Sequence, residues 1–473
     1  MKHLTIAPVL ILSILFHWGS AWAQTFPPEP GRGQTILSPS YDGSGAEMLT
    51  LADGLRQVMN NSRQVQITRL EENMAAADTG TARAGLLPSA NTSLSHTSLA
   101  YQPQAIFTSP GVSIPILPGI LIGAGTQHIP QYQRNFWSYS ISVQQTLFDF
   151  WSSLSRYRAS QEILVNKKLD TARVQNVIAL DFAVAFFDFL EAEKMVELAR
   201  KEVERLEAHL RDARNLYASG AITRNDLLQA EVRLSDGQQK LLNASNGRDL
   251  QASKVNYLLL RPLNATLRVL DPEFQVREGP FTVEEAWNLA LQQRPEIQIV
   301  DGSLKALKLE ETARKADYYP RLFAKGGYDY TENRYMVHED NWSLIFGFTL
   351  NLFAGGSTQA QVAKNHYQQA QTLQQRDKLL DDIRLEVKRY LLDLQNARER
   401  IRVNQGAADQ AQENLRINNV RYAEGVGTAT EVLDAVTLLT TSETNYVRSI
   451  YDFRRAEAAA YYAVGKDLRE VYR

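Results

Sequence analysis

The chain has 473 residues, with 51 basic and 53 acidic side chains, a formal net charge of −2 and no cysteine. The absence of cysteine excludes disulfides, thiol chemistry and a lipid-modified N-terminal cysteine. The balanced charge, without a basic patch, argues against a nucleic-acid partner.

The N-terminus predicts an export signal. Lys2 and His3 precede a mostly apolar stretch over residues 4–18, and Ala21 and Ala23 place small residues before a cleavage point. A membrane anchor is the alternative, but the apolar run is short for a helical span of about 20 residues. We expect a signal peptide over residues 1–23, followed by an extended segment over 24–48 that is rich in Pro, Gly and Ser.

The remainder of the chain contains an internal duplication. Residues 217–230 recur at 422–435, an offset of 205 positions, and residues 51–88 match 283–320 at an offset of 232. The first copy therefore holds 27 extra residues between the matched stretches. We predict two repeats, 49–270 and 271–468, and a short C-terminal tail, 469–473. Each repeat is expected to run helix, two strands, very long helix, turn and helix.

The strands are predicted from alternating polarity. From Trp342 to Leu352 the even positions are large and apolar, and from Trp137 to Leu147 the apolar residues mostly alternate with Ser, Gln and Thr. The strands that follow Pro88 and Pro320 are fainter. Such two-faced strands suit lipid on one side and water on the other. A sandwich strand with one solvated face is the alternative. Four strands cannot close a barrel within one chain, so we expect several chains to supply the wall.

A very long helix follows the strands in each repeat. Apolar residues recur at spacings of three and four from Phe182 to Tyr217 and again from Val387 to Tyr422, which is a sustained heptad pattern. Each helix is expected to run for roughly 65 residues, or about 100 Å. An ordinary coiled-coil rod is the alternative, but helices joined directly to membrane-type strands favour a wall.

Each long helix is predicted to end at a glycine. Gly220 and Gly425 suit the left-handed position that follows a helix C-terminus. The next helix then begins with a threonine and an acidic residue in a capping-box arrangement, Thr223 with Asp226 and Thr428 with Glu431.

Together these features resemble the outer-membrane efflux (TolC-like) family. The resemblance depends on the paired Tyr-x-x-Gly turns at 217–220 and 422–425 and on the paired prolines that precede the strands. It also depends on the Leu-Phe pairs at 147–148 and 352–353, and it covers residues 49–468. It implies a mainly α fold with a membrane β-barrel portion. Three protomers would each give four strands to one shared 12-stranded barrel in outer-membrane lipid and would enclose an α-helical tunnel in the periplasm.

The resemblance also implies a function. The chain would be the exit duct of a tripartite efflux or type I secretion system in a Gram-negative-type cell. The duct would receive substrates from an inner-membrane transporter and a periplasmic adaptor (membrane fusion) protein. The resemblance does not identify the class of substrate. A trimeric coiled-coil surface or scaffold protein without transport activity is the alternative. We expect no enzyme, cofactor or metal, because the seven histidines are scattered and no catalytic motif is present.

The resemblance implies that the second turn lines the narrow entrance of the tunnel, with its acids at Glu431 and Asp434. Glu431 and Asp434 lie three residues apart on one helix face. Threefold symmetry would gather them into a ring of six carboxylates that favours cations and whose gating depends on pH. A simple helix cap is the alternative for both acids, and it is the stronger alternative for Glu431.

The family also closes this entrance with links between neighbouring helix pairs. Tyr422 and Asp226 match one such link, a phenol that donates to a carboxylate. Gly427 stands where relatives commonly have a basic residue, so we expect a looser closed state unless Arg224 or Arg421 substitutes. The tip turns and adaptor contacts are assigned to Tyr217, Gly220, Gly425, Leu228 and Leu433.

The 27 extra residues fall within 101–133, an apolar and proline-containing stretch between the first two strands. The prolines exclude a regular helix. We expect a long outer loop, which membrane barrels commonly carry. The alternative is that the stretch folds over the mouth of the barrel or contacts lipid or a surface partner.

Overall fold

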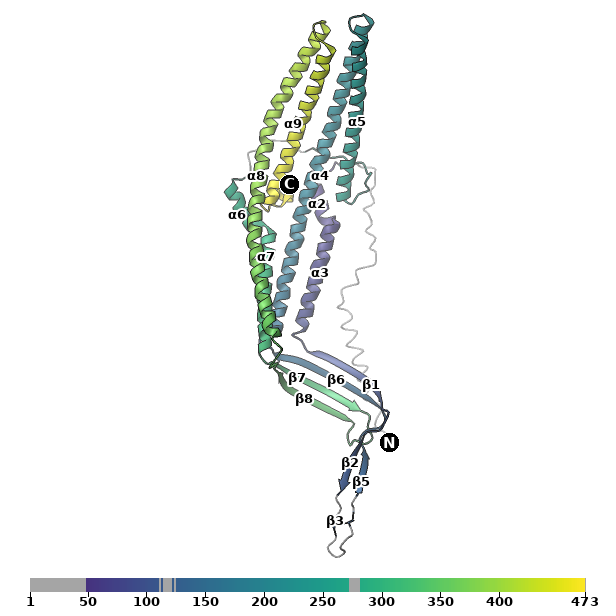
Figure 1. The fold of residues 1–473 in the computed structure, drawn as a ribbon, viewed down its shortest axis with the longest axis vertical. Coiled ribbons are helices and arrows are strands. Elements are labelled where there is room, and N and C mark those ends of the chain that lie inside the picture. The colour runs from purple at the N-terminus through teal and green to yellow at the C-terminus, as the bar shows by residue number, and fades with distance from the viewer. Residues whose placement is uncertain (1–47, 110–111, 114–120, 123–124, 272–280, 473) are drawn as a thin grey trace.

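The computed structural model describes residues 48–109, 112–113, 121–122, 125–271 and 281–472. The predicted signal peptide, nearly all of the extended segment and the last residue of the tail lie outside these residues. Within the described chain, long helices occupy one end of an elongated molecule and the strands occupy the other (Figure 1).

The elements follow the predicted repeat. The first copy contains α2 (Leu51–Asn61), α3 (Arg63–Ala84), β1 (Ser89–Ser98), β6 (Asn135–Phe148), α4 (Ser152–Ala218) and α5 (Arg224–Leu258). The second copy contains α6 (Val283–Gln293), α7 (Pro295–Lys315), η2 (Ala316–Tyr318), β7 (Arg321–Thr331), β8 (Asp340–Thr349), α8 (Ser357–Ala423) and α9 (Ala429–Ala463). A short helix, α10 (Leu468–Val471), follows.

The first helix of each repeat is broken in two. Ser62 leaves the helical region with a ψ of 132°, and Arg294 does the same with a ψ of 123°. Arg294 precedes Pro295, which disfavours helical geometry at the residue before it and suits the first position of the next helix. The prediction of one helix at this point was therefore too coarse.

The four predicted strands form one antiparallel sheet in the order β1-β6-β7-β8. The register places side chains of one kind on each face. One face is largely apolar and carries Leu94, Trp137, Tyr139, Ile141, Val143, Leu322, Tyr328, Trp342, Leu344, Phe346 and Phe348. The other face is mostly polar and carries Ser89, Asn91, Ser93, Ser95, Ser138, Ser140, Ser142, Gln144, Lys325, Asp329, Asn341, Ser343 and Thr349.

The described residues of the predicted outer loop form paired strands, a detail that the sequence patterns did not predict. Strand β2 (Gln104–Ser109) pairs with β5 (Gly125–Pro130), and β3 (Val112–Ser113) pairs with β4 (Leu121–Ile122) beyond them. The two arms extend away from the main sheet (Figure 1). Prolines exclude a helix but are tolerated at strand ends, and Pro130 is the last residue of β5. Most of the apolar centre, 114–120, lies outside the described residues.

The long helices are 67 residues each and are paired, α4 with α5 and α8 with α9. The predicted heptad positions largely face neighbouring helices: Phe182, Phe189 and Leu206 in α4 and Val387 and Leu394 in α8 are buried. Helix α4 also packs against α3, α7 and α9, so it is central to the protomer.

The densest packing surrounds the middle of α4. Phe182 and Phe186 are fully buried there against α2, and Leu468 of α10 joins the same cluster. A Cβ atom at Gly54 of α2 would lie 2.1 Å from the Phe182 ring, so only glycine allows this approach. A parallel bridge joins Leu49 to Val269, in the stretch after α5. Within the described residues, none of the helices has a stretch apolar and long enough to span a bilayer.

Candidate functional site

The two helix-pair tips end in matching turns. Gly220 and Gly425 have φ values of +77° and +74°, the left-handed geometry predicted for them. In each turn a backbone N–H returns to the helix: Ala221 donates to the Leu216 carbonyl at 2.8 Å. Val426 donates to the Arg421 carbonyl at 3.0 Å. The turns thus complete the backbone hydrogen bonding of both long helices.

Both predicted capping boxes are present. The Thr223 N–H donates to the Asp226 carboxylate at 3.0 Å, and the Asp226 N–H donates to the Thr223 hydroxyl oxygen at 3.3 Å. In the second tip the Thr428 N–H donates to the Glu431 carboxylate at 3.1 Å, and the Glu431 N–H donates back at 3.2 Å. In this protomer Asp226 and Glu431 therefore each cap the N-terminus of a helix.

The structure gives a reason for glycine at position 427. A Cβ atom there would lie 3.0 Å from the Tyr422 nitrogen and 3.1 Å from the Arg421 carbonyl carbon. The Gly427 N–H also donates to the Arg421 carbonyl at 3.0 Å. The Arg421 guanidinium lies 3.9 Å from the Glu431 carboxylate, whereas Arg224 is exposed on α5. Of the two arginines, Arg421 is thus the one that approaches Glu431.

The predicted surface residues of the tips divide into two groups. Tyr217 and Leu228 are 42% and 48% exposed, and Asp434 is exposed on α9. Leu433 is only 4% exposed, because it packs with Leu415 and other residues in the core of the α8–α9 tip. The Leu433 side chain is therefore buried in this protomer, and its contact with an adaptor stays a prediction.

The predicted link between Tyr422 and Asp226 is not formed within this protomer. The Tyr422 hydroxyl is buried and has no hydrogen-bond partner, while Asp226 is occupied by its helix cap. Burial raises the pKa of Tyr422, and the nearby carboxylates of Asp226 and Asp212 raise it further. The link stays a prediction, and the cap contacts of Asp226 leave its second carboxylate oxygen available to accept from the phenol.

Sequence reasoning missed His209, which lies beside Tyr422. The ring centroids are 5.3 Å apart, His209 is 5% exposed, and its Nε2 has no hydrogen-bond partner. Burial lowers the pKa of His209, and the Asp212 carboxylate opposes this effect. The available signal was a histidine three residues after Leu206 in an apolar heptad pattern.

His209 and Tyr422 belong to the contact between the pair α4–α5 and the pair α8–α9, which we call the helix-pair joint. Farther from the tip, Arg205 of α4 forms a bidentate pair with Glu443 of α9, at 2.9 and 2.7 Å. Both side chains are 24% exposed. The joint therefore holds a charged pair with its hydrogen bonds formed, one helical turn away from an imidazole whose Nε2 has no partner.

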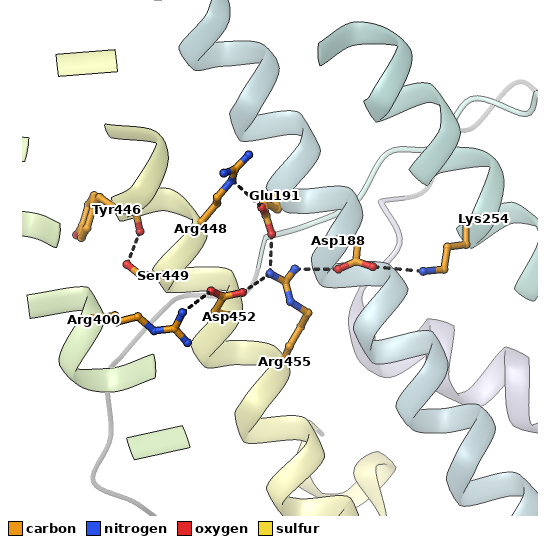
Figure 2. Close-up of polar contacts among 9 residues, drawn as sticks. All are labelled: Asp188, Glu191, Lys254, Arg400, Tyr446, Arg448, Ser449, Asp452 and Arg455. Carbon is orange, nitrogen blue, oxygen red and sulfur yellow. Dashed lines mark hydrogen bonds and ion pairs between the residues drawn. The ribbon is translucent and has the colours of Figure 1, made fainter. Parts of the chain in front are cut away.

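A larger network occupies the joint still farther from the tip (Figure 2). We call it the waist network, and it contains Asp188, Glu191, Lys254, Arg400, Arg448, Asp452 and Arg455. Arg455 of α9 contacts Asp188 at 2.8 Å and Glu191 at 2.7 Å, both on α4. It also contacts Asp452 at 2.7 Å on its own helix. Burial opposes the charge, but the three carboxylates outweigh it and raise the pKa of Arg455.

The outer parts of the waist network reach the other two helices. Lys254 of α5 lies 3.3 Å from Asp188, and Arg400 of α8 lies 3.5 Å from Asp452. The network therefore ties all four helices together through charge-assisted contacts. Among the described residues, no group of three or more metal-binding side chains is found.

Comparison with known proteins identifies the scaffold. The outer membrane efflux protein family model matches residues 54–255 and 286–466, one stretch in each repeat. The chain belongs to the outer membrane efflux protein family. It is 24% identical to the alkaline protease secretion protein AprF of Pseudomonas aeruginosa over 342 residues, 70% of each chain. It is 22% identical to the outer membrane efflux protein BepC of Brucella suis, over 69% of this chain and 71% of that protein.

Solved structures agree on the fold of this family. The outer membrane protein VceC of Vibrio cholerae superposes with a TM-score of 0.73 at 17% identity, over 88% of this chain and 96% of that one. The outer-membrane channel OprN gives 0.74 at 16% identity, over 89% and 90%. The family member is thus an outer-membrane exit duct with a helical tunnel in the periplasm, and not an enzyme. The scaffold alternative is wrong, because a four-stranded sheet interrupts the heptads.

Proposed function

We propose that three copies of the chain assemble into one duct whose periplasmic entrance is formed by the helix-pair tips. The edges of the sheet carry this proposal. Strands β1 and β8 each have one neighbour in the described sheet, so each has an unpaired row of backbone groups. In a bilayer these groups need partners, and pairing β8 of one copy with β1 of the next supplies them. Three four-stranded sheets then close into a 12-stranded wall.

The helices support the same assembly. Large apolar side chains are exposed along α5 and α8, away from the contacts within the protomer. They include Val232, Leu242 and Leu250 of α5 and Leu385, Leu392, Val403 and Val420 of α8. Apolar stripes of this kind are normally covered. Neighbouring copies in a ring would cover them with each other.

At the entrance of this trimer, Glu431 and Asp434 would contribute two acids per copy. Asp434 is exposed and has no structural contact to exchange, which supports a role toward the lumen. Glu431 would serve both as helix cap and as part of the ring, with Arg421 close to it. Such a constriction attracts cations and repels anions.

The duct would receive its substrates from an inner-membrane transporter through a periplasmic adaptor. Tyr217 and Leu228 are exposed at the first tip and suit contact with an adaptor helix. The name of AprF refers to protease secretion and that of BepC to efflux. We infer that secretion of a polypeptide is the first activity to test, because AprF shows the higher identity of the two.

Conductance of the purified protein in a planar bilayer tests the proposal. We expect trimers with cation-selective conductance, and we expect Glu431→Gln with Asp434→Asn to reduce that selectivity. Glu424→Gln is the matched control, since Glu424 is an exposed acid in the same turn. Selectivity that is unchanged by the double variant would contradict the carboxylate ring. A monomeric protein without conductance would contradict the duct itself.

A further inference from the structure

The helix-pair joint has a distinctive chemistry at its tip end. The imidazole of His209 and the phenol of Tyr422 come from opposite helix pairs, and each has a buried polar atom without a hydrogen-bond partner. A buried polar group without a partner is destabilising, because it has lost its hydrogen bonds to water without replacement. While the two rings are packed together, both polar atoms therefore lack hydrogen bonds. Separation of the helix pairs would expose both atoms to water, which would supply those bonds.

The surroundings of His209 hold no contacting counterion. From α4, Asp212 lies one turn along, and the Arg205 guanidinium is held by Glu443 of α9. From α8 the facing titratable group is Tyr422. From α5, the Asp226 carboxylate influences Tyr422 from its position in the helix cap.

The same groups line an open cleft of about 470 Å³ between the pairs. Helix α9 contributes Val432 and Val436 to its wall, and both are apolar. Its polar wall contains Asn215, Asn419 and two charged groups, Arg205 and Asp212, of which Arg205 is paired with Glu443. Because burial outweighs the Asp212 carboxylate, a charged imidazolium is less stable while the pairs are packed together.

We propose that His209 makes the tip of the helix-pair joint acid-sensitive, so that protonation of its imidazole separates the tip of the pair α4–α5 from the tip of the pair α8–α9 and opens the entrance. This inference rests on the proposed function in one respect, namely that the tips form the entrance. Separation exposes the imidazole to water, where its charged form is favourable. The waist network holds the same two pairs together farther down, so the movement is a spreading of the tips about a fixed point.

The direction of the pH effect follows from the burial. Burial holds the pKa of His209 below its ordinary value in the packed state, despite the opposing Asp212 carboxylate. In the separated state the pKa returns toward its ordinary value of about 6.5. The packed state therefore loses stability relative to the separated state as pH falls through that ordinary value. The effect is complete below the lowered pKa.

Two measurements on the full-length trimer test the proposal. Because the chain has no cysteine, Ser219→Cys and Glu424→Cys place one spin label on each tip turn without background labelling. Co-expression with excess unlabelled chain gives trimers with one labelled copy. We expect the distance between the labels to increase between pH 8 and pH 5.5. We also expect the open population to increase about tenfold per unit of pKa difference between the two states.

The variants separate titration from packing. His209→Gln and His209→Phe both remove the charge, and the second retains an aromatic ring against Tyr422, so at least one should fold. In the Glu431→Gln, Asp434→Asn background, where the carboxylate ring no longer titrates, each should abolish the change in label distance. His366→Gln is the control, because His366 is a half-exposed histidine on α8 beside Glu311 and should leave the change intact. A pH response that persists in a folded His209 variant would overturn the proposal.

Conductance distinguishes this inference from the proposed function. The carboxylate ring also titrates, so the comparison is made in the Glu431→Gln, Asp434→Asn background, where the remaining acid response should depend on His209. Tips that separate without a change in conductance would contradict their role as the entrance. Tips that do not separate on acidification would contradict the role of His209.

Discussion

The two ends of the helix-pair joint differ in how well their polar groups are satisfied. At the waist network, Arg455 contacts three carboxylates on two helices at 2.7–2.8 Å. At the tip, His209 and Tyr422 lie against each other without a hydrogen bond. The two helix pairs are therefore joined by ion pairs at the waist network, whereas His209 and Tyr422 only pack against each other at the tip. This difference indicates where the protomer can move while the tunnel stays intact.

The largest expected effect comes from breaking the waist. Arg455→Met removes the central cation and leaves Glu191 and Asp452 without their strongest partner. We expect a loss of about 2–3 kcal/mol of stability, since the group is only partly exposed. Thermal unfolding followed by circular dichroism measures it. Arg448→Met is the matched control, because Arg448 is 60% exposed and 3.9 Å from Glu191, and it should cost less than about 0.5 kcal/mol. Equal losses would show that the waist network is not centred on Arg455.

The Arg205–Glu443 pair lies between the two ends and should give an intermediate effect. Arg205→Met removes a bidentate contact across the joint and should cost about 1–2 kcal/mol. It should also increase the leak of the resting channel in a planar bilayer, because the pair is closer to the tip. The exposed Arg402→Met, which loses only a contact to Glu399 on its own helix, should change neither. A larger increase in leak in Arg455→Met than in Arg205→Met would contradict the expectation that contacts closer to the tip have the greater effect on leak.

The substitution at the tip should have the smallest effect on stability, and it should stabilise the protein rather than destabilise it. Tyr422→Phe removes a buried hydroxyl that has no partner, so we expect a gain of up to about 1 kcal/mol and no increase in resting leak. Thermal unfolding and conductance measure the two. Tyr390→Phe is a suitable control, because Tyr390 is another partly buried tyrosine on α8. An increased leak in Tyr422→Phe would instead show that the phenol reaches Asp226 in the closed trimer.

Local patterns predicted much of this fold because they depend on near neighbours in the chain. The repeat offset located four strands and two long helices, and the glycine and threonine positions identified both turns and both capping boxes. The break at Ser62 and the pairing of β2 with β5 were missed, since neither a backbone turn at one serine nor pairing between two six-residue arms leaves a clear periodic signal.

The site was harder to predict than the fold. The contact of His209 with Tyr422 depends on how α4 lies against α8, and the heptad pattern of one helix does not fix the axial register of two. The same reason hid the role of Arg455, whose two partners on α4 lie more than 260 positions away. Leu433 was assigned to the surface by resemblance alone, whereas packing within the α8–α9 tip buries it.

The most direct test compares movement at the two ends of the joint in one experiment. Spin labels at Lys194→Cys and Asn445→Cys, two exposed positions on α4 and α9, report on the region near the waist network. Labels at Ser219→Cys and Glu424→Cys report on the tips. Between pH 8 and pH 5.5 we predict a longer distance at the tips and an unchanged distance near the waist. Equal changes at both positions, or a change only near the waist, would contradict a joint that is fixed at one end and free at the other.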